Sequence, residues 1–187
     1  MKLQAKVVLI TGGGRGIGRT LAEMLANSSA AVAVMGRDLD SLSDTVSMIE
    51  SAGGRALAVR GDVLNRDDIC AAVDEVESSL GPIDVLINNA GALFNDYAAT
   101  PEGLERSVSL LLLSPWRLTE QLLPLLRRST SPARVINVVS GGMYTQKLRC
   151  DELIMPDNHY DGTVAYARAK RALTVLTELW AQQWAED

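Results

Sequence analysis

A cluster of glycines follows the first apolar run of the chain and precedes its first helical pattern. The apolar run covers residues 6–10, and the turn after it reads Thr11-Gly12-Gly13-Gly14-Arg15-Gly16-Ile17-Gly18. Glycines at 12, 16 and 18 permit a tight strand-to-helix turn, close approach of phosphate oxygens to the backbone, and close packing of helix on strand. The turn therefore predicts a site for a nucleotide pyrophosphate, with a purely structural turn as the alternative.

Apolar runs and helical patterns alternate along the whole chain. Short apolar runs cover residues 6–10, 31–35, 56–59, 85–87 and 135–139. Between them, apolar residues recur at three- or four-residue steps and mark three helix faces: Ile17, Leu21, Met24 and Leu25; Leu39, Leu42, Val46 and Ile49; Ile69, Val73, Val76 and Leu80. Continuous apolar strands indicate burial on both faces of a sheet. We therefore predict an α/β fold: a Rossmann-type, doubly wound parallel sheet in three α/β/α layers, within one domain spanning residues 1–187.

Several helix boundaries have local causes. Asn65, with Asp67 and Asp68 behind it, is typical of a helix start, and the pairs at 53–54 (Gly-Gly) and 81–82 (Gly-Pro) are typical of helix ends. Two prolines, at 115 and 124, lie inside a helical segment at about residues 103–128, where we expect a kink or a break.

Composition excludes several classes of function. The chain has 187 residues, 47% of them hydrophobic, and a net charge of -5, which disfavours binding to nucleic acid. No apolar stretch approaches the roughly 20 residues that span a bilayer, so we expect a cytoplasmic protein without a membrane span. Cys70 and Cys150 are isolated thiols, and His159 is the only histidine. No metal site is predicted, because metal-ligand spacing is absent.

The second half of a dinucleotide site is predicted after the run at 85–87, in Asn88-Asn89-Ala90-Gly91. Small and amide side chains there can bond to backbone and let a ribose or nicotinamide pass, and strand ends near a topological switch point are where such ligands bind. We assign Asn89, Ala90 and Gly91 to the cofactor.

Charges at the end of the second strand indicate which dinucleotide binds. The strand ends in Gly36-Arg37 and lacks the acidic residue that would hold an adenosine ribose. Arg37, with Arg15 in the glycine turn, can meet a 2'-phosphate, which favours NADP(H) over NAD(H); two solvated arginines are the alternative. Asp62 and Val63 follow the third strand and could hold the adenine, although an Asp there is also typical of a helix start.

Three side chains near the end of the chain suggest the reacting groups. Tyr166 and Lys170 lie one turn apart on a helix, where the ammonium favours the phenolate and makes Tyr166 a plausible acid or base. Ser140, at the end of the fifth strand, could hydrogen-bond a carbonyl oxygen that gains negative charge. Each of these features is common in structural roles, and it is their order after both glycine motifs that indicates catalysis.

The combined motifs resemble those of the short-chain dehydrogenase/reductase family, over essentially the whole chain. They are Thr11-Gly12-x-x-x-Gly16-x-Gly18, Asn88-Asn89-Ala90-Gly91, Ser140 and Tyr166-x-x-x-Lys170. Residues 135–148 and 160–163 are further similar to the branch of that family around member 12. The resemblance implies NADPH-dependent reduction of a small-molecule carbonyl, or the reverse alcohol oxidation. It also implies a homo-oligomer, a dimer in which the helices at residues 108–126 and 166–184 pair across a two-fold axis. In it, Tyr166 transfers a proton, Lys170 binds ribose hydroxyls and Ser140 steers the substrate oxygen.

The sequence departs from the family pattern in two places, and these departures suggest an alternative to an active oxidoreductase. Leu111 takes the place where the family usually has an asparagine that supports a proton path to the lysine. The chain stops at Asp187, where relatives usually add two strands and a substrate lid, so we expect a C-terminally truncated form and poor cover for the apolar face of Leu173, Leu176, Trp180 and Trp184. The alternative is a non-catalytic nucleotide-binding or interaction module.

Overall fold

The computed structural model describes residues 3–129 and 132–184. Its contacts divide the chain into two compact units. The first unit comprises Met1–Ala90 and Leu118–Ile136, and the second comprises Gly91–Arg117 and Asn137–Asp187.

The first unit is built on a five-stranded sheet in the order β3-β2-β1-β4-β5. The strands are β1 (Val7–Thr11), β2 (Ala31–Gly36), β3 (Arg55–Arg60), β4 (Val85–Asn88) and β5 (Arg134–Asn137), the last residue of β5 belonging to the second unit. β1 pairs in parallel with β2 and β4, and β2 pairs in parallel with β3. This order reverses direction at β1, so the predicted doubly wound fold is confirmed.

Burial separates the central strands from the outer ones. Every residue of β1 and β4 is buried, as are the first five residues of β2. In β3 only Val59 is buried, and in β5 Arg134 and Ile136 are exposed. The prediction of burial on both faces is therefore wrong for β3 and β5, because these strands lie at the two ends of the sheet order and have a neighbour on one side only.

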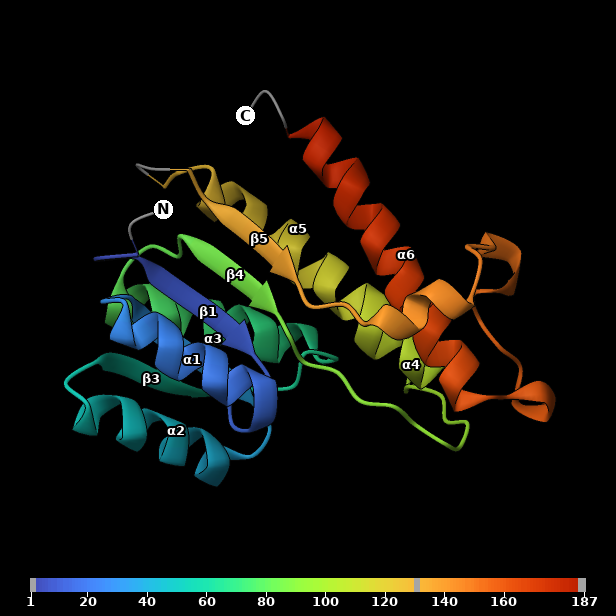
Figure 1. The fold of residues 1–187 in the computed structure, drawn as a ribbon, viewed down its shortest axis with the longest axis horizontal. Coiled ribbons are helices and arrows are strands. Elements are labelled where there is room, and N and C mark those ends of the chain that lie inside the picture. The colour runs from blue at the N-terminus through green and yellow to red at the C-terminus, as the bar shows by residue number, and fades with distance from the viewer. Residues whose placement is uncertain (1–2, 130–131, 185–187) are drawn as a thin grey trace. The chain divides into compact units, whose positions relative to one another are not determined.

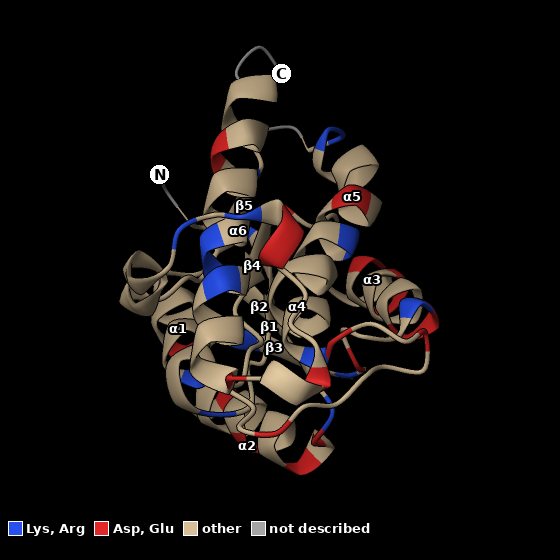
Figure 2. Ribbon diagram, turned by 90° about the vertical axis from the view of Figure 1, so that its right-hand side faces the viewer, with Lys and Arg blue, Asp and Glu red and all other residues tan. Residues whose placement is uncertain are grey.

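Helices α1 (Gly16–Asn27) and α3 (Arg66–Leu80) cover opposite faces of this sheet, and α2 (Leu39–Ser51) packs near β3 (Figures 1 and 2). Asn65 caps α3 as predicted, since its side chain accepts hydrogen bonds from two amides of the first turn. α2 and α3 also end just before the glycines expected to stop them. These boundaries follow from local chemistry.

The predicted apolar face of α1 is wrong for Ile17 and Met24, whereas Leu21 and Leu25 are half-buried. Ile17 and Met24 are 66% and 62% exposed, whereas Gly18, Ala22 and Ala26 are buried. Small residues let a helix backbone lie closer to its sheet than larger side chains would. The buried face of α1 is therefore the one with the smallest side chains and not the most hydrophobic one. In α2 and α3 the predicted residues Leu42, Ile49, Ile69, Val73 and Val76 are buried, Val46 and Leu80 are half-buried, and Leu39, the first residue of α2, is exposed.

A buried carboxylate joins separate parts of the first unit. Asp84 accepts hydrogen bonds from the Lys6 ammonium at 2.9 Å, from the Val7 amide at 2.9 Å and from the Ser129 hydroxyl at 2.8 Å. Burial by itself raises the pKa of Asp84, but these hydrogen bonds outweigh it and hold the pKa below its ordinary value. The carboxylate therefore fastens the start of β1 to the residue that precedes β4.

The second unit is built around α6 (Gly162–Gln183), which packs on the short helix α4 (Arg106–Val108) and on a π-helical turn, η1 (Ser109–Leu113). The next helix, α5 (Ser114–Leu126), runs from this unit into the first. The predicted interruption is thus the π-helical turn, which ends at Leu113, two residues before Pro115, while α5 continues through Pro124.

The apolar face of α6 is better covered than expected. Leu173 is fully buried in a cluster with Val108, Leu112 and Ala172, and Trp180 is 5% exposed. Trp180 also stacks on Trp184, with ring centroids 5.2 Å apart. The expectation of poor cover is therefore wrong for Leu173 and Trp180.

Candidate active site

The glycine turn between β1 and α1 is closely packed at one point and open at another. A Cβ atom at Gly18 would lie 2.1 Å from the Gly12 carbonyl oxygen, so only glycine fits there. Gly12 and Gly16 have φ angles of +69° and +54°, which favour glycine, and a Cβ at Gly16 would meet nothing within 4 Å. The turn thus combines tight packing against its own backbone with free space at Gly16.

The amides that follow the turn are available to an anion. Within residues 3–129 and 132–184, the amides of Gly14 and Arg15 donate no hydrogen bond. Arg15 is the N-cap of α1, and its side chain makes no capping hydrogen bond. Because the amino end of a helix also carries a partial positive charge, this cradle fits the pyrophosphate of a dinucleotide.

The tetrapeptide at 88–91 is fastened to the same turn. The Thr11 hydroxyl oxygen accepts hydrogen bonds from the amides of Asn89 and Ala90, at 3.1 Å and 3.0 Å. The Asn89 side-chain amide donates to the carbonyl oxygens of Thr11 and Gly12, at 2.9 Å and 3.2 Å. Thr11 and Asn89 therefore hold the ends of β1 and β4 together; the backbone contacts of Asn89 were predicted from its amide side chain, whereas those of Thr11 were not.

The residues assigned to the adenosine end lie beside β2 and β3. Arg37 is exposed and forms an ion pair with Asp62 at 3.8 Å. Asp62 also accepts a hydrogen bond from the Leu64 amide at 3.0 Å, and Val63 is buried. The helix-start alternative for Asp62 is wrong, because Asn65 caps α3.

In the second unit, Tyr166 and Lys170 both lie on α6, as predicted. The Lys170 ammonium is buried and donates a hydrogen bond to the Val138 carbonyl oxygen at 2.7 Å. Burial lowers the pKa of Lys170 from 10.5 to about 8. The half-buried Tyr166 hydroxyl makes no hydrogen bond within the described part of the chain, so it has no internal partner to displace.

Ser140 directly precedes a short 3-10 helix, η2 (Gly141–Thr145). Its hydroxyl oxygen accepts a hydrogen bond from the Gly142 amide at 3.3 Å. An accepting hydroxyl keeps its own hydrogen for another oxygen, so Ser140 remains able to donate to a substrate.

Leu111 is fully buried within the π-helical turn η1. The neighbouring hydroxyls of Ser109 and Ser114 donate to carbonyl oxygens one turn earlier, those of Glu105 and Leu110, each at 2.9 Å. Neither serine therefore supplies a free polar group in place of the amide that the family usually has.

The segment before α6 is anchored to the loop that follows residue 91. The Tyr160 hydroxyl lies 2.7 Å from the Ser107 hydroxyl and donates to the Phe94 carbonyl oxygen at 3.3 Å. Burial raises the pKa of Tyr160, so its hydroxyl keeps the proton that it donates. A Cβ at Gly162 would lie 1.8 Å from the same Phe94 oxygen, so the first residue of α6 must be glycine. No sequence pattern pointed to this anchor, because it joins residues far apart in the chain.

The insertion between Ser140 and Tyr166 folds back on α6. Arg168 donates to the Glu152 carboxylate and to its carbonyl oxygen, each at 2.7 Å. Figure 2 shows basic residues on α6, where Arg168, Lys170 and Arg171 are close in sequence.

No group of three or more metal-binding side chains occurs among residues 3–129 and 132–184. Over those same ranges, no helix is long and apolar enough to cross a membrane.

Comparison with known proteins places these motifs in a family. Residues 6–150 match the family model described as short chain dehydrogenase. The chain is 35% identical over 184 residues to human "Dehydrogenase/reductase SDR family member 12". This alignment covers 97% of this chain and 57% of that relative. The chain thus spans little more than half of the length of this relative, and the family and branch predicted from the motifs are confirmed.

Solved structures agree over the whole chain. A short-chain dehydrogenase/reductase of unknown function from Caenorhabditis elegans, determined with cofactor, has a TM-score of 0.82 at 28% identity and covers 100% of this chain and 67% of its own. A metagenomic short-chain oxidoreductase in complex with NADP has a TM-score of 0.77 at 25% identity and covers 100% of this chain and 79% of its own.

Proposed function

Because the chain belongs to the short-chain dehydrogenase/reductase family, we propose that it is an oxidoreductase that interconverts a small carbonyl compound and its alcohol, using NADP(H). Residues 1–187 would act as one NADP(H)-binding domain. The observation that carries the proposal is the Tyr166 hydroxyl, which has no hydrogen bond to any described residue and lies one helical turn from the buried Lys170 ammonium. When bound, the dinucleotide supplies or accepts the hydride.

Each side chain of the second unit has a defined task in this reaction. In the reductive direction, the Tyr166 hydroxyl donates its proton to the carbonyl oxygen while the carbonyl carbon gains hydride, and the product is the alcohol. The Ser140 hydroxyl donates a hydrogen bond to the same oxygen and stabilises its negative charge. Lys170 holds the ribose hydroxyls of the dinucleotide beside Tyr166.

Residues of the glycine turn and of the 88–91 tetrapeptide would hold the dinucleotide, through the amides from Gly14 to Gly18 and through Asn89, Ala90 and Gly91. The preference for NADP(H) is supported by Gly36 and Arg37, which place a cation and no carboxylate at the end of β2. Asp62, now paired with Arg37, would share that guanidinium with a 2'-phosphate.

The test is titration with NADPH and NADH, followed by turnover on a panel of aldehydes and ketones. We expect Tyr166→Phe to keep dinucleotide binding and to lose at least about a hundredfold of turnover, since it lacks the transferable proton. Thr163→Ala, at an exposed position of the same helix, is the matched control. Binding without turnover in the wild-type protein would instead favour the nucleotide-binding module, with which the buried Leu111 agrees.

We also propose a cytoplasmic homo-oligomer, in which the helices at residues 108–126 and 166–184 pair across a two-fold axis. The support is the composition of the chain and the apolar pattern of these helices. Sedimentation of the purified protein tests the oligomer, and a single monomeric species would reject it.

A further inference from the structure

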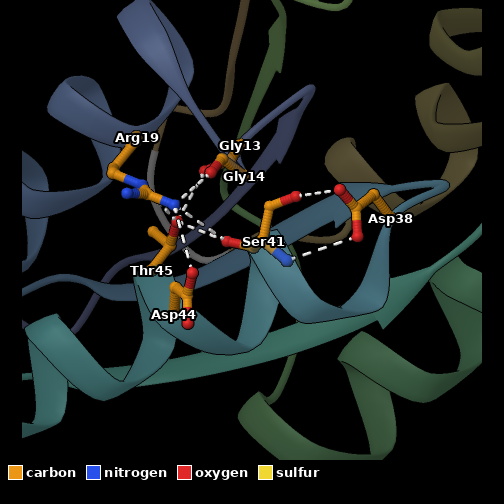
Figure 3. A network of polar contacts seen from close by, with 7 residues as sticks. All are labelled: Gly13, Gly14, Arg19, Asp38, Ser41, Asp44 and Thr45. Carbon is orange, nitrogen blue, oxygen red and sulfur yellow. Dashed lines mark hydrogen bonds and ion pairs between the residues drawn. The ribbon is translucent and has the colours of Figure 1, made fainter.

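Two side chains outside the glycine motif bind the carbonyl oxygens of the turn (Figure 3). The Arg19 guanidinium donates to the Gly14 carbonyl oxygen at 2.6 Å, and the Thr45 hydroxyl donates to that of Gly13 at 3.2 Å. Arg19 also donates to the Thr45 hydroxyl oxygen at 3.0 Å. The two side chains thus form one polar connection between α1, α2 and the turn.

The same pair is anchored at the start of α2. The Ser41 carbonyl oxygen accepts hydrogen bonds from Thr45 at 3.0 Å and from Arg19 at 3.3 Å. Asp38 caps α2 by accepting hydrogen bonds from the Ser41 amide and hydroxyl, and these bonds lower the pKa of Asp38. The residue that precedes this cap is Arg37, so the network connects the turn to the segment assigned to the 2'-phosphate.

The direction of these carbonyl groups fixes the direction of the amides. In a trans peptide the C=O of one residue and the N–H of the next point to opposite sides, and the described chain has no cis peptide bond. Hydrogen bonds at the carbonyl groups of Gly13 and Gly14 therefore turn the amides of Gly14 and Arg15 away from Arg19 and Thr45. Neither of these two amides donates a hydrogen bond within the described ranges.

We propose that Arg19 and Thr45 are positioning residues that hold the glycine turn with its amides directed at the pyrophosphate. This inference rests on the proposed function only for the identity of the anion. The pair acts on the part that NADPH and NADH share, so it sets the affinity for both dinucleotides and not the preference between them.

The burial of Thr45 and the backbone contacts of the half-buried Arg19 support this role over a surface contact. Thr45 is fully buried; its single O–H lies between the carbonyl oxygens of Gly13 and Ser41, and its oxygen accepts from Arg19. Asp44 is 4.0 Å from Arg19 and largely exposed, so this ion pair is the weak member of the network. The shortest contact of Arg19 is its hydrogen bond to the Gly14 carbonyl oxygen of the turn.

The first test measures dinucleotide binding by Thr45→Val and Arg19→Ala. We expect each to raise the dissociation constants of NADPH and NADH by the same factor, about tenfold, which corresponds to the loss of one hydrogen bond to a charged group. Thr45→Ser keeps the hydroxyl and should restore binding. Arg37→Ala should weaken the binding of NADPH and not that of NADH. This difference separates a contact to the 2'-phosphate from the contacts that orient the turn.

Arg55→Ala is the matched control for a general loss of stability. Arg55 also donates from its guanidinium to a backbone carbonyl oxygen at 2.6 Å, that of Ser79, but it lies in β3 and does not contact the turn. We expect this variant to bind both dinucleotides like the wild type. Equal weakening by Arg55→Ala and Arg19→Ala would overturn the proposal.

A second measurement needs no ligand. Backbone ¹⁵N relaxation of Gly14 and Arg15 should show lower order parameters in Thr45→Val than in the wild type, because the peptide planes lose their restraint. Unchanged order parameters would overturn the proposal whatever the dissociation constants. Looser amides in a protein whose wild type binds neither dinucleotide would support the positioning role and reject the proposed function.

Discussion

The buried ammonium of Lys170 makes a quantitative prediction about stability and pH. Burial lowers the pKa of Lys170 to about 8, from 10.5 in the unfolded chain. Between these values the unfolded chain binds more protons than the folded protein, so the free energy of unfolding rises with pH. The contribution is close to zero at about pH 7 and reaches about 2 kcal/mol near pH 9.5, since one pKa unit corresponds to about 1.4 kcal/mol.

The assay is urea unfolding at a series of pH values from about 7 to 9.5, followed by tryptophan fluorescence. Trp180 is a suitable reporter, because it is buried on the same helix as Lys170. Lys170→Met removes the titrating group at similar volume, so its free energy of unfolding should lack the rise of about 2 kcal/mol. Above this range Tyr160 contributes with the opposite sign, because its pKa is raised.

Lys147→Met is the control, because Lys147 is an exposed lysine in the same unit. Its pH dependence should follow that of the wild type. Parallel curves for the wild type and Lys170→Met would refute the reasoning, since the proton release would then not come from Lys170.

Three further substitutions test packing and buried polar contacts. Asp84→Asn should lower the free energy of unfolding by about 1–3 kcal/mol in urea titrations near neutral pH; because the folded pKa is lowered, the wild type should lose this contribution as the pH falls below about 4. Gly162→Ala should cost about 1–3 kcal/mol, as its Cβ would clash with the Phe94 oxygen, whereas Gly141→Ala meets nothing within 4 Å and should change little. Tyr160→Phe should lower the free energy of unfolding by about 1 kcal/mol, seen as a lower Tm; an unchanged Tm would show that the Tyr160 hydroxyl contacts do not stabilise the fold.

The parts of the fold that could be predicted are those with local causes. The order of strands and helices follows from periodicity, and the ends of α2 and α3 follow from a capping asparagine and from glycines. The apolar face of α1 could not be read from hydrophobicity. Its contact with the sheet is made by Gly18, Ala22 and Ala26, while Ile17 and Met24 remain exposed.

The site divides in the same way. Tyr166, Lys170 and the glycines could be found because their spacing is fixed within one helix or one turn. The partners of Arg19 and Tyr160 could not, because each contact depends on residues brought together by packing. Arg19 meets Thr45 across 26 positions, and Tyr160 meets Phe94 across 66.

This difference has a consequence for mutagenesis of the two units. The dinucleotide is proposed to bind backbone amides, which no substitution removes, so affinity is best altered through side chains that orient the backbone, such as Arg19 and Thr45. The proton is proposed to come from a side chain, so turnover is altered directly at Tyr166. Variants of the first kind should change KM for the dinucleotide with little change in kcat, and variants of the second kind should lower kcat at unchanged affinity. A Thr45→Val variant that lost kcat at saturating dinucleotide would show that the turn does more than bind.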